Sequence, residues 1–237
     1  MAEFLEMRNI VKKFPGVLAL DHVNLKVRKG EVHALLGENG AGKSTLMKIL
    51  SGAYQKDEGE ILIDGVSIKD NPIECKKKFA YIPDNPDLYD FMTAIQYLNF
   101  VADIFNVPAD ERTELIHKYA DIFEIRNDLA QPISSFSHGM KQKLALISAL
   151  IHKPKLVIMD EPFVGLDPKA SHLLKGIMRE ICDNGGAIFF STHVLEVAEK
   201  LCDKVAIIKG GKLIRCGTMD EVKGDESLES AFLELEG

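Results

Sequence analysis

Apolar and polar residues alternate along two stretches near the start of the chain, residues 4–11 and 23–27. A period of two is typical of strands with one buried face, so we expect two strands here, paired antiparallel. Short runs of strand-forming residues follow, each bounded by turn or breaker residues. These runs are residues 32–36, 60–63, 79–82, 156–159, 187–190 and 205–208.

The period changes to that of a helix between residues 93 and 123, where apolar residues recur three and four positions apart. We also expect helices over 44–50, after Pro168, after Thr192 and over 227–235. Beyond residue 153, strands and helices alternate, as in parallel sheets covered by helices. The pattern therefore predicts an α/β fold with a mainly parallel sheet, an N-terminal antiparallel β subdomain and an inserted α-helical subdomain.

Composition and charge narrow the classes of protein that fit this pattern. The chain has 237 residues, of which 46% are hydrophobic, enough for one large domain with a sizeable core. The four cysteines form no C-x-x-C pair, which disfavours a metal knuckle and fits a reducing cytosol. A net charge of −7 makes nucleic acid an unfavourable partner. The start of the chain lacks the pattern of a signal peptide, and no apolar run has the length of a membrane span.

A glycine-rich loop follows the strand predicted over 32–36 and matches the pattern G-x-x-x-x-G-K-[ST]. In such a loop, backbone N–H groups surround a polyphosphate, Lys43 reaches its β and γ oxygens, and the Ser44 hydroxyl can ligate Mg²⁺. The alternative is a glycine-rich turn with a surface lysine, which the flanking strand and helix disfavour. The predicted nucleotide-binding residues of this loop are Gly37, Glu38, Asn39, Gly40, Ala41, Gly42, Lys43, Ser44 and Thr45.

Two adjacent carboxylates end the apolar run over 156–159. Next to a phosphate loop, Asp160 can hold Mg²⁺ and Glu161 can polarise an attacking water, as in P-loop nucleoside triphosphatases. Taken alone, the pair could equally mark a strand leaving the core.

A serine stands at another informative position, before the helical run over 138–150. Ser137 is a plausible N-cap there, and capping alone would explain it.

These motifs occur in the order typical of an ATP-binding cassette (ABC) transporter ATPase, which nearly the whole chain resembles. The resemblance implies that Ser137 and Gly139 contact the γ-phosphate bound to the opposite subunit of a head-to-tail homodimer. It also implies that Asp167 crosses that dimer interface and that His193 holds the γ-phosphate and the catalytic carboxylate in line. Lys43, Glu161 and His193 are thus the expected catalytic residues. Without the resemblance, His193 would be an ordinary polar residue after a strand.

Phe14 matches the aromatic residue that stacks on adenine in this family, and a flat apolar ring suits a base; the alternative is a core phenylalanine. Asp84 stands where the family usually has glutamine, and an acid can ligate Mg²⁺ but cannot donate a hydrogen bond. The expected metal ligands are therefore Ser44, Asp84 and Asp160. The signature segment departs from the family at two positions, where His138 replaces a glycine and Met140 a glutamine.

The resemblance differs along the chain. Residues 6–65 look most like the first cassette of sugar importers, whereas the remainder looks like single-cassette ATPases of exporters, so a hybrid joined between about Gly65 and Lys77 is one interpretation. We expect one ABC ATPase domain over 1–237, with a core and β subdomain at about 1–90 and 153–220, a helical subdomain at about 91–152 and a C-terminal helix at 221–237.

The resemblance implies an ATP- and Mg²⁺-dependent ATPase on the cytoplasmic face of the membrane, powering a separate permease, with a bias toward export. The permease would dock on the helical insertion after Asp84. Two rivals remain: an ATP-binding dimerisation or sensor module with little hydrolysis, and a DNA-repair or ribosome-rescue cassette. The second rival is disfavoured because those relatives carry two cassettes or long coiled-coil arms.

Overall fold

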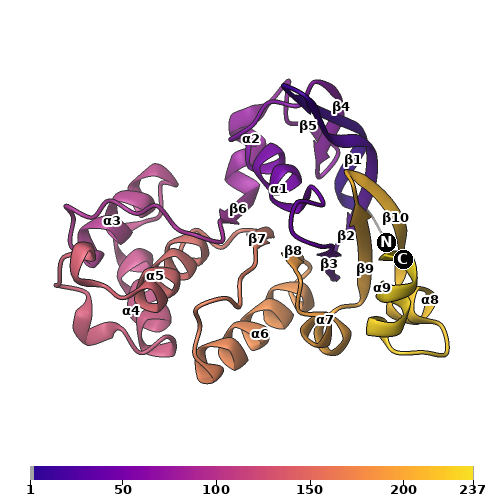
Figure 1. The fold of residues 1–237 in the computed structure, drawn as a ribbon. Helices are drawn as coiled ribbons and strands as arrows, with labels where there is room; N and C mark the ends of the chain where they lie inside the picture. The colour runs from indigo at the N-terminus through magenta and orange to yellow at the C-terminus, as the bar shows by residue number, and fades with distance from the viewer. Residues whose placement is uncertain (1–2, 237) are drawn as a thin grey trace.

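The computed structural model describes residues 3–236, and its centre is a six-stranded sheet with the strand order β10-β9-β3-β8-β7-β6 (Figure 1). All neighbours are parallel except β10, which runs antiparallel to β9. Every residue of β3, β7 and β8 is buried, as expected for central parallel strands covered on both faces. The strands are β3 (Val32–Leu36), β6 (Phe79–Ile82), β7 (Leu156–Asp160), β8 (Ala187–Thr192), β9 (Lys204–Lys209) and β10 (Lys212–Thr218).

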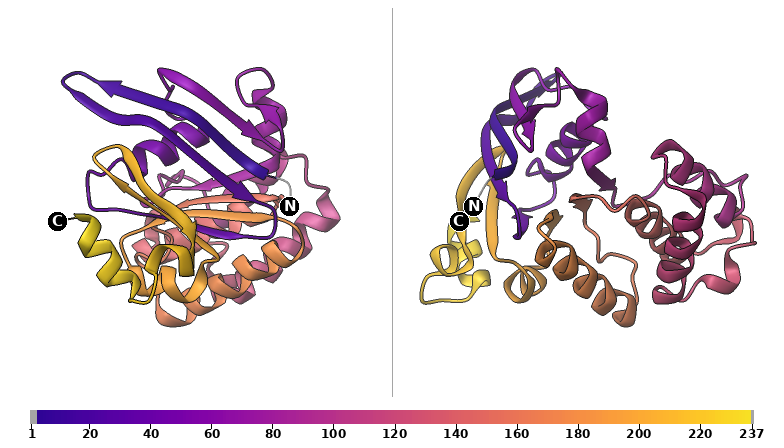
Figure 2. Two further views of the ribbon diagram at one scale, coloured as in Figure 1. Left: turned by 90° about the vertical axis from the view of Figure 1, so that its right-hand side faces the viewer. Right: turned by 180° about the vertical axis from the view of Figure 1, so that it is seen from behind.

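A second, antiparallel sheet has the order β2-β1-β4-β5 and crosses above the first (Figure 2, left). The hairpin from β4 to β5 turns at Asp64 and Gly65, both with positive φ, which suits the right-handed twist of the strands. The strands are β1 (Glu3–Phe14), β2 (Val17–Arg28), β4 (Glu58–Ile63) and β5 (Val66–Ser67).

Helices cover both faces of the six-stranded sheet, and three of them, α3 to α5, form a group at one side of the molecule (Figures 1 and 2). The first of these begins with a capping box between Thr93 and Gln96. The helices are α1 (Lys43–Ser51), α2 (Pro72–Lys78), α3 (Ala94–Ile104), α4 (Ala109–Ile122), α5 (His138–Leu150), α6 (Pro168–Asp183), α7 (Leu195–Leu201), α8 (Met219–Lys223) and α9 (Leu228–Glu236), with 3₁₀ turns at Arg126–Asp128 and Ile133–Ser135.

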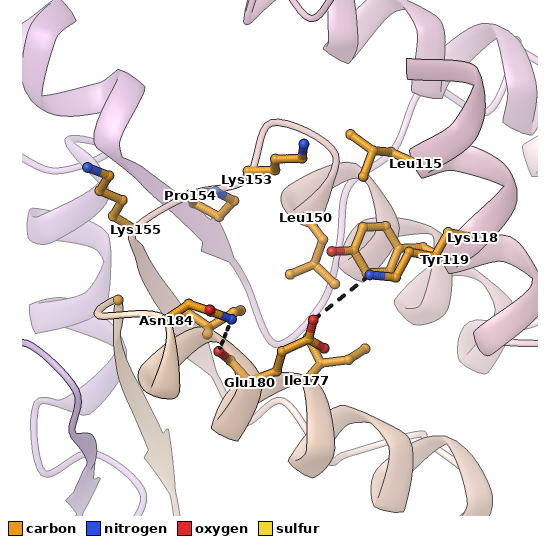
Figure 3. Close-up of a pocket in the computed structure, with 12 residues that line it drawn as sticks. Leu115, Lys118, Tyr119, Leu150, Lys153, Pro154, Lys155, Ile177, Glu180 and Asn184 are labelled. Atoms are coloured by element: carbon orange, nitrogen blue, oxygen red, sulfur yellow. Dashed lines mark hydrogen bonds and ion pairs between the residues drawn. The ribbon is translucent and has the colours of Figure 1, made fainter. Parts of the chain in front are cut away.

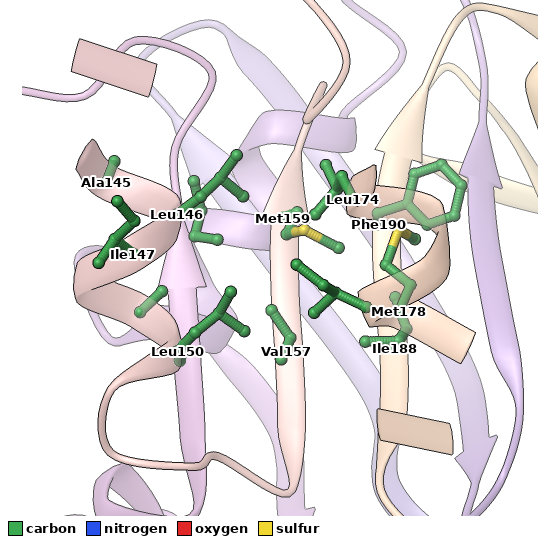
Figure 4. Packing of buried hydrophobic residues seen from close by; sticks show 14 of the residues in the cluster. Ala145, Leu146, Ile147, Leu150, Val157, Met159, Leu174, Met178, Ile188 and Phe190 are labelled. Atoms are coloured by element: carbon green, nitrogen blue, oxygen red, sulfur yellow. The ribbon is translucent and has the colours of Figure 1, made fainter. Parts of the chain in front are cut away.

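Alternate side chains of the central strands enter two separate cores. Ile188 and Phe190 of β8 point toward α5 and α6, where they join Leu146, Leu174 and neighbours (Figure 4). Their neighbours in the strand, such as Phe189, face α1 and the antiparallel sheet. The helix α1 is therefore packed between the two sheets, and its N-terminus is fixed by apolar contacts on both sides.

The mixed fold predicted from the sequence is confirmed, including the antiparallel pair at the N-terminus and the parallel central sheet. Three elements, α2, β10 and α8, were not predicted, and β2 starts at Val17 rather than near Val23. In α2 only Cys75 is buried, and β10 is an exposed edge strand, so neither element shows a clear apolar period. Among the described helices, none has both the length and the apolar character needed to cross a membrane.

Candidate active site

Many of the predicted site residues lie at one edge of the parallel sheet, where β3, β7 and β8 end, whereas Phe14, Ser137 and Gly139 lie elsewhere. Leu36 at the end of β3 is level with Thr192 of β8, and Asp160 at the end of β7 is level with Ser191. The loop after β3 and the residues after β7 and β8 therefore leave the sheet side by side. Loops at the carboxyl ends of parallel strands are the usual ligand-binding edge of open α/β sheets.

The phosphate loop packs tightly against its surroundings at two of its glycines. A Cβ on Gly37 would lie 2.5 Å from the Ile208 carbonyl oxygen, and one on Gly42 would lie 2.9 Å from the Ala19 carbonyl oxygen. Gly42 also has φ of +111°, which disfavours any L side chain. It precedes α1 without a side-chain cap, so the first N–H groups of the helix remain available for an anion.

Lys43 is buried beneath this loop and is held by the loop's own carbonyl groups. Its ammonium donates hydrogen bonds to the Gly37 oxygen at 2.6 Å and the Glu38 oxygen at 3.1 Å. The same nitrogen lies 4.0 Å from Oε1 of Glu161. The positive charge is thus positioned between the loop and the carboxylate.

Glu161 and His193 form a pair at the edge of the sheet. Nδ1 of His193 lies 2.9 Å from Oε1 of Glu161, and the His193 backbone N–H donates to Oε2 at 3.4 Å. Glu161 has φ of +48°, a strained conformation for a non-glycine residue. Its N–H donates to both the carbonyl and the hydroxyl of Ser191, which hold this conformation.

Asp160 is almost fully buried, and only one of its carboxylate oxygens is satisfied. Oδ1 accepts a hydrogen bond from the Ser191 hydroxyl, whereas Oδ2 has no hydrogen-bond partner among the described residues. The Tyr81 hydroxyl is also buried and without such a partner there. Burial, followed by the charges of Asp160 and Asp84, raises the pKa of Tyr81. A buried carboxylate oxygen without a donor is suited to a cation or an ordered water.

The oxygens present fit a magnesium ion that keeps water and phosphate ligands. Ser44 and Asp84 are exposed and line the same pocket, whereas Asp160 is buried at the end of β7 and is not among the lining residues. Over residues 3–236, no cluster of three or more Asp, Glu, His or Cys residues forms a ready metal cage. Mg²⁺ in nucleotide sites typically uses only one or two protein oxygens, so this donor set is compatible with it.

A pocket of about 350 Å³ opens over the phosphate loop. It is lined by many of the predicted residues: Glu38, Asn39, Gly40, Gly42, Lys43, Ser44, Thr45, Asp84 and Glu161. It is also lined by residues that the sequence did not suggest: Val17, Leu18, Ala19, Gly210 and Gly211. These come from β2 and from the turn between β9 and β10, and only the paired glycines of that turn gave a local signal.

Phe14 is not among the residues that line this pocket. Its ring meets Tyr54 edge-on at 5.7 Å between centroids, and Lys12 Nζ lies 5.2 Å from its centroid. The ring is 37% exposed, so it is neither a core residue nor part of the pocket wall.

Ser137 and Gly139 are also absent from the pocket lining and lie at the start of α5. Ser137 caps this helix by accepting a hydrogen bond from the Met140 N–H at 3.3 Å. A Cβ on Gly139 would lie 2.8 Å from the Gly165 oxygen, and one on Gly165 would lie 2.7 Å from the His138 ring. The start of α5 thus packs directly on the loop that follows Glu161. Lys143 and Asp167 add an ion pair of 2.8 Å.

A separate cleft of about 350 Å³ lies between α4, the end of α5 and α6 (Figure 3). It has an apolar floor that includes Leu150 and Ile177, and Lys118 reaches Glu180 across it at 4.0 Å. None of the predicted site residues lines it.

Comparison with known proteins identifies the family and the fold. A family model described as "ABC transporter" matches residues 20–164. An uncharacterised ABC transporter ATP-binding protein of Nostoc sp. is 34% identical over 89% of the chain and 63% of its own length. The probable multidrug ABC transporter ATP-binding protein YbhF of Escherichia coli is 30% identical over 98% of the chain and 41% of its own length.

The chain thus spans less than two thirds of these two relatives. A solved structure of an "ATP binding subunit of ABC transporter" is 34% identical and superposes with a TM-score of 0.94, covering 99% of this chain and all of that one. Each of these three matches covers at least 89% of the chain and is described by a single overall identity, and the hybrid interpretation stays a prediction. The phosphate loop, the ordered motifs around it and the matched fold together show that this chain belongs to the ATP-binding subunits of ABC transporters.

Proposed function

We propose that the chain hydrolyses ATP, with Glu161, His193 and Lys43 as its catalytic residues. The observation that carries this proposal is the Glu161–His193 pair, 2.9 Å apart, with Lys43 4.0 Å from the same carboxylate oxygen. Glu161 orients and polarises the attacking water, His193 holds Glu161 and the γ-phosphate in line, and Lys43 neutralises charge on the phosphate oxygens. Catalysis of phosphoryl transfer comes mostly from such positioning and electrostatics.

The phosphates of ATP bind the backbone of residues 37–45 and the N-terminus of α1. Mg²⁺ would be held by the Ser44 hydroxyl and by the carboxylates of Asp160 and Asp84. When bound, it would neutralise charge on the β and γ oxygens of ATP. This assignment is supported by the Asp160 oxygen that lacks a donor among residues 3–236. The apolar residues Val17 and Leu18 at the pocket wall suit the adenine, and Phe14, which lies outside the pocket lining, would cover the same base from the adjoining end of β1.

A second copy of the chain completes the site in a head-to-tail homodimer. Ser137 and Gly139 do not line the pocket over their own phosphate loop, and Ser137 is exposed at the start of α5. These residues would reach the γ-phosphate bound by the partner subunit, and Asp167 would lie at the interface. A monomer then contains two half-sites.

The ATPase works on a separate membrane permease, from the cytoplasmic face. An aromatic group near the start of α3 supports docking there: Tyr89 contacts Phe91 and Phe100, and Phe91 is 82% exposed. Large exposed aromatic residues are typical of protein interfaces. They lie within residues 91–152, our proposed helical subdomain, or directly before it. The name of YbhF, a probable multidrug ABC transporter ATP-binding protein, favours export.

The test is ATP turnover by the purified chain against Glu161→Gln, with Glu196→Gln as a matched control on α7, away from the pocket. Glu161→Gln should bind ATP, elute as a dimer and lose turnover by roughly a hundredfold or more, as expected when a general base is removed. Glu196→Gln should keep the parental rate, and the rate should rise faster than linearly with protein concentration. Unchanged turnover in Glu161→Gln would contradict the role given to this carboxylate.

One observation favours the sensor alternative, namely the acid Asp84 in the pocket wall. A carboxylate there repels the phosphates unless a cation lies between them. The sensor function would be supported if the parental chain dimerised with ATP but did not hydrolyse it, and if Asp84→Gln did hydrolyse it.

A further inference from the structure

Another pocket, of about 450 Å³ and distinct from the cleft of Figure 3, lies at the opposite end of α1 from the phosphate loop. Its walls come from α1, β4 and α2 and from the connections that follow α1 and precede α2, and these elements lie close together in Figure 1. Ile49, Ile61 and Ile68 give it an apolar floor, and Tyr54 presents a partly exposed ring. The nine residues of α1 separate it from the phosphate loop by about 13 Å.

Lysines surround this pocket. Lys56, Lys69 and Lys76 line it, and Lys48 Nζ lies 5.5 Å from the centroid of the Tyr54 ring. Within residues 3–236, none of these four ammonium groups has a carboxylate oxygen within 4.0 Å. Gly52 has φ of +80°, and its missing Cβ leaves room for Lys76 Nζ, which would lie 3.4 Å from that Cβ.

Two of the acids close by in sequence are engaged by other partners, whereas Asp70, next to Lys69, is exposed and forms no ion pair within residues 3–236. Asp57 accepts hydrogen bonds from Lys12 Nζ and from the Lys13 N–H, and Glu74 pairs with Lys78. Lys48 and Lys56 are half-buried, so part of their hydration is lost without a compensating anion. Among the described residues, three lysines and no acid line the pocket, so its wall carries an excess of positive charge.

This charge is unusual for the molecule, whose net charge is −7. The cleft of Figure 3 also contains three lysines, but two of them, Lys118 and Lys153, are paired with Glu180 and Glu111, and only Lys155 has no ion pair within residues 3–236. Three unpaired lysines around one concave surface create a field that attracts multivalent anions. Lysine ammonium groups bind phosphate as flexible point charges, and the apolar floor and Tyr54 can cover a ring or chain.

We propose that this pocket binds a phosphorylated ligand with at least two negative charges and a compact apolar or aromatic part. The ligand can be a soluble phosphate ester or the phosphorylated headgroup of a lipid. The site is distinct from the phosphate loop, and it does not depend on whether the chain hydrolyses ATP.

Nuclear magnetic resonance of the full chain with ¹³C-labelled lysine tests this site, with inorganic pyrophosphate as the probe. The ε signals of Lys56, Lys69 and Lys76 should shift and saturate, those of Lys77 and Lys155 should not move, and Lys43 reports the phosphate loop separately. Shifts confined to Lys43, or shifts of all lysines without saturation, would overturn the proposal.

Charge removal gives the matched comparison. Lys69→Gln/Lys76→Gln should weaken pyrophosphate binding by about tenfold, because exposed charge pairs each contribute modestly; the signal of Lys56 follows the binding. The same variant should leave ATP turnover unchanged. Lys77→Gln/Lys155→Gln removes the same charge elsewhere and should bind like the parent. Equal binding by both double variants would also overturn the site.

Vesicles of phosphatidylcholine, with and without phosphatidylinositol phosphate, then separate the two sources. Sedimentation with the phosphorylated vesicles, lost in Lys69→Gln/Lys76→Gln, supports the lipid headgroup. Saturable pyrophosphate binding without vesicle binding supports the soluble ester.

Discussion

The Ser191 side chain serves two site residues at once. Its hydroxyl donates to Oδ1 of Asp160 and accepts from the N–H of Glu161. One small side chain therefore fixes the orientation of a buried carboxylate and the strained backbone of the next residue. The sequence identified Asp160 and Glu161 from their position after an apolar strand. The role of Ser191 depends on how β7 and β8 pair, which no local pattern specifies.

Ser191→Ala removes both interactions and leaves Asp160 buried with neither oxygen satisfied. We expect the free energy of unfolding to fall by about 1–3 kcal/mol, the cost of an unsatisfied buried polar group. We also expect ATP turnover to fall by roughly tenfold, because Glu161 loses a backbone restraint. Urea unfolding and turnover measure these effects, with the exposed Ser134→Ala as control. A parental turnover rate in Ser191→Ala would show that Glu161 is held by other contacts.

At the scale of elements, the contact between α5 and the loop before α6 connects two parts of the site that the sequence treated separately. Gly139 and Gly165 each lie too close to neighbouring atoms to accept a Cβ, and Lys143 pairs with Asp167 across the same contact. The first of these helices was predicted from its apolar pattern and its serine cap, and the second from the proline after Asp167. Their contact could not be predicted, because it joins residues far apart in sequence.

Gly165→Ala tests this contact, and Gly176→Ala is its control. Gly165 has φ of +79°, and a Cβ added there would lie 2.7 Å from the His138 ring, so its replacement should destabilise the protein by about 1–3 kcal/mol. Gly176 lies within α6 and its Cβ would meet no atom within 4 Å, so alanine there should stabilise by about 0.5–1 kcal/mol. Thermal unfolding measures both. Adding His138→Ala to Gly165→Ala should restore part of the loss, and no restoration would mean that backbone strain alone is responsible.

At the scale of the whole molecule, His152 joins the helical group to the central sheet. Its ring stacks on Phe105 with centroids 3.7 Å apart, and Nε2 lies 3.4 Å from the Phe79 carbonyl oxygen. Burial lowers the pKa of His152 to about 4. A histidine in a sequence gives no sign of such burial, although the helical period around it was clear.

The pH dependence of stability follows from this pKa. Since the folded state disfavours the protonated ring, the unfolded chain takes up the proton first as pH falls below the ordinary value of 6.5. Neutral His152 therefore makes its full contribution to the free energy of unfolding above about pH 6.5. This contribution, on the order of 2 kcal/mol, is lost as pH falls toward 4. Denaturant unfolding at several pH values should show a weaker pH dependence for His152→Gln than for the parent. His172→Gln, at an exposed position, is the control, and equal slopes in parent and His152→Gln would contradict the assignment.

The level ends of β3, β7 and β8 also determine where this protein can change length. Residues inserted into the connections, such as the segment that carries α3 to α5, leave Leu36, Asp160 and Thr192 at the same edge. A single residue inserted within β7 would instead turn Asp160 to the other face of the sheet, since side chains alternate along a strand. Evolution of this chain is thus free to enlarge the loops and the helical group, while the three short strands must keep their lengths.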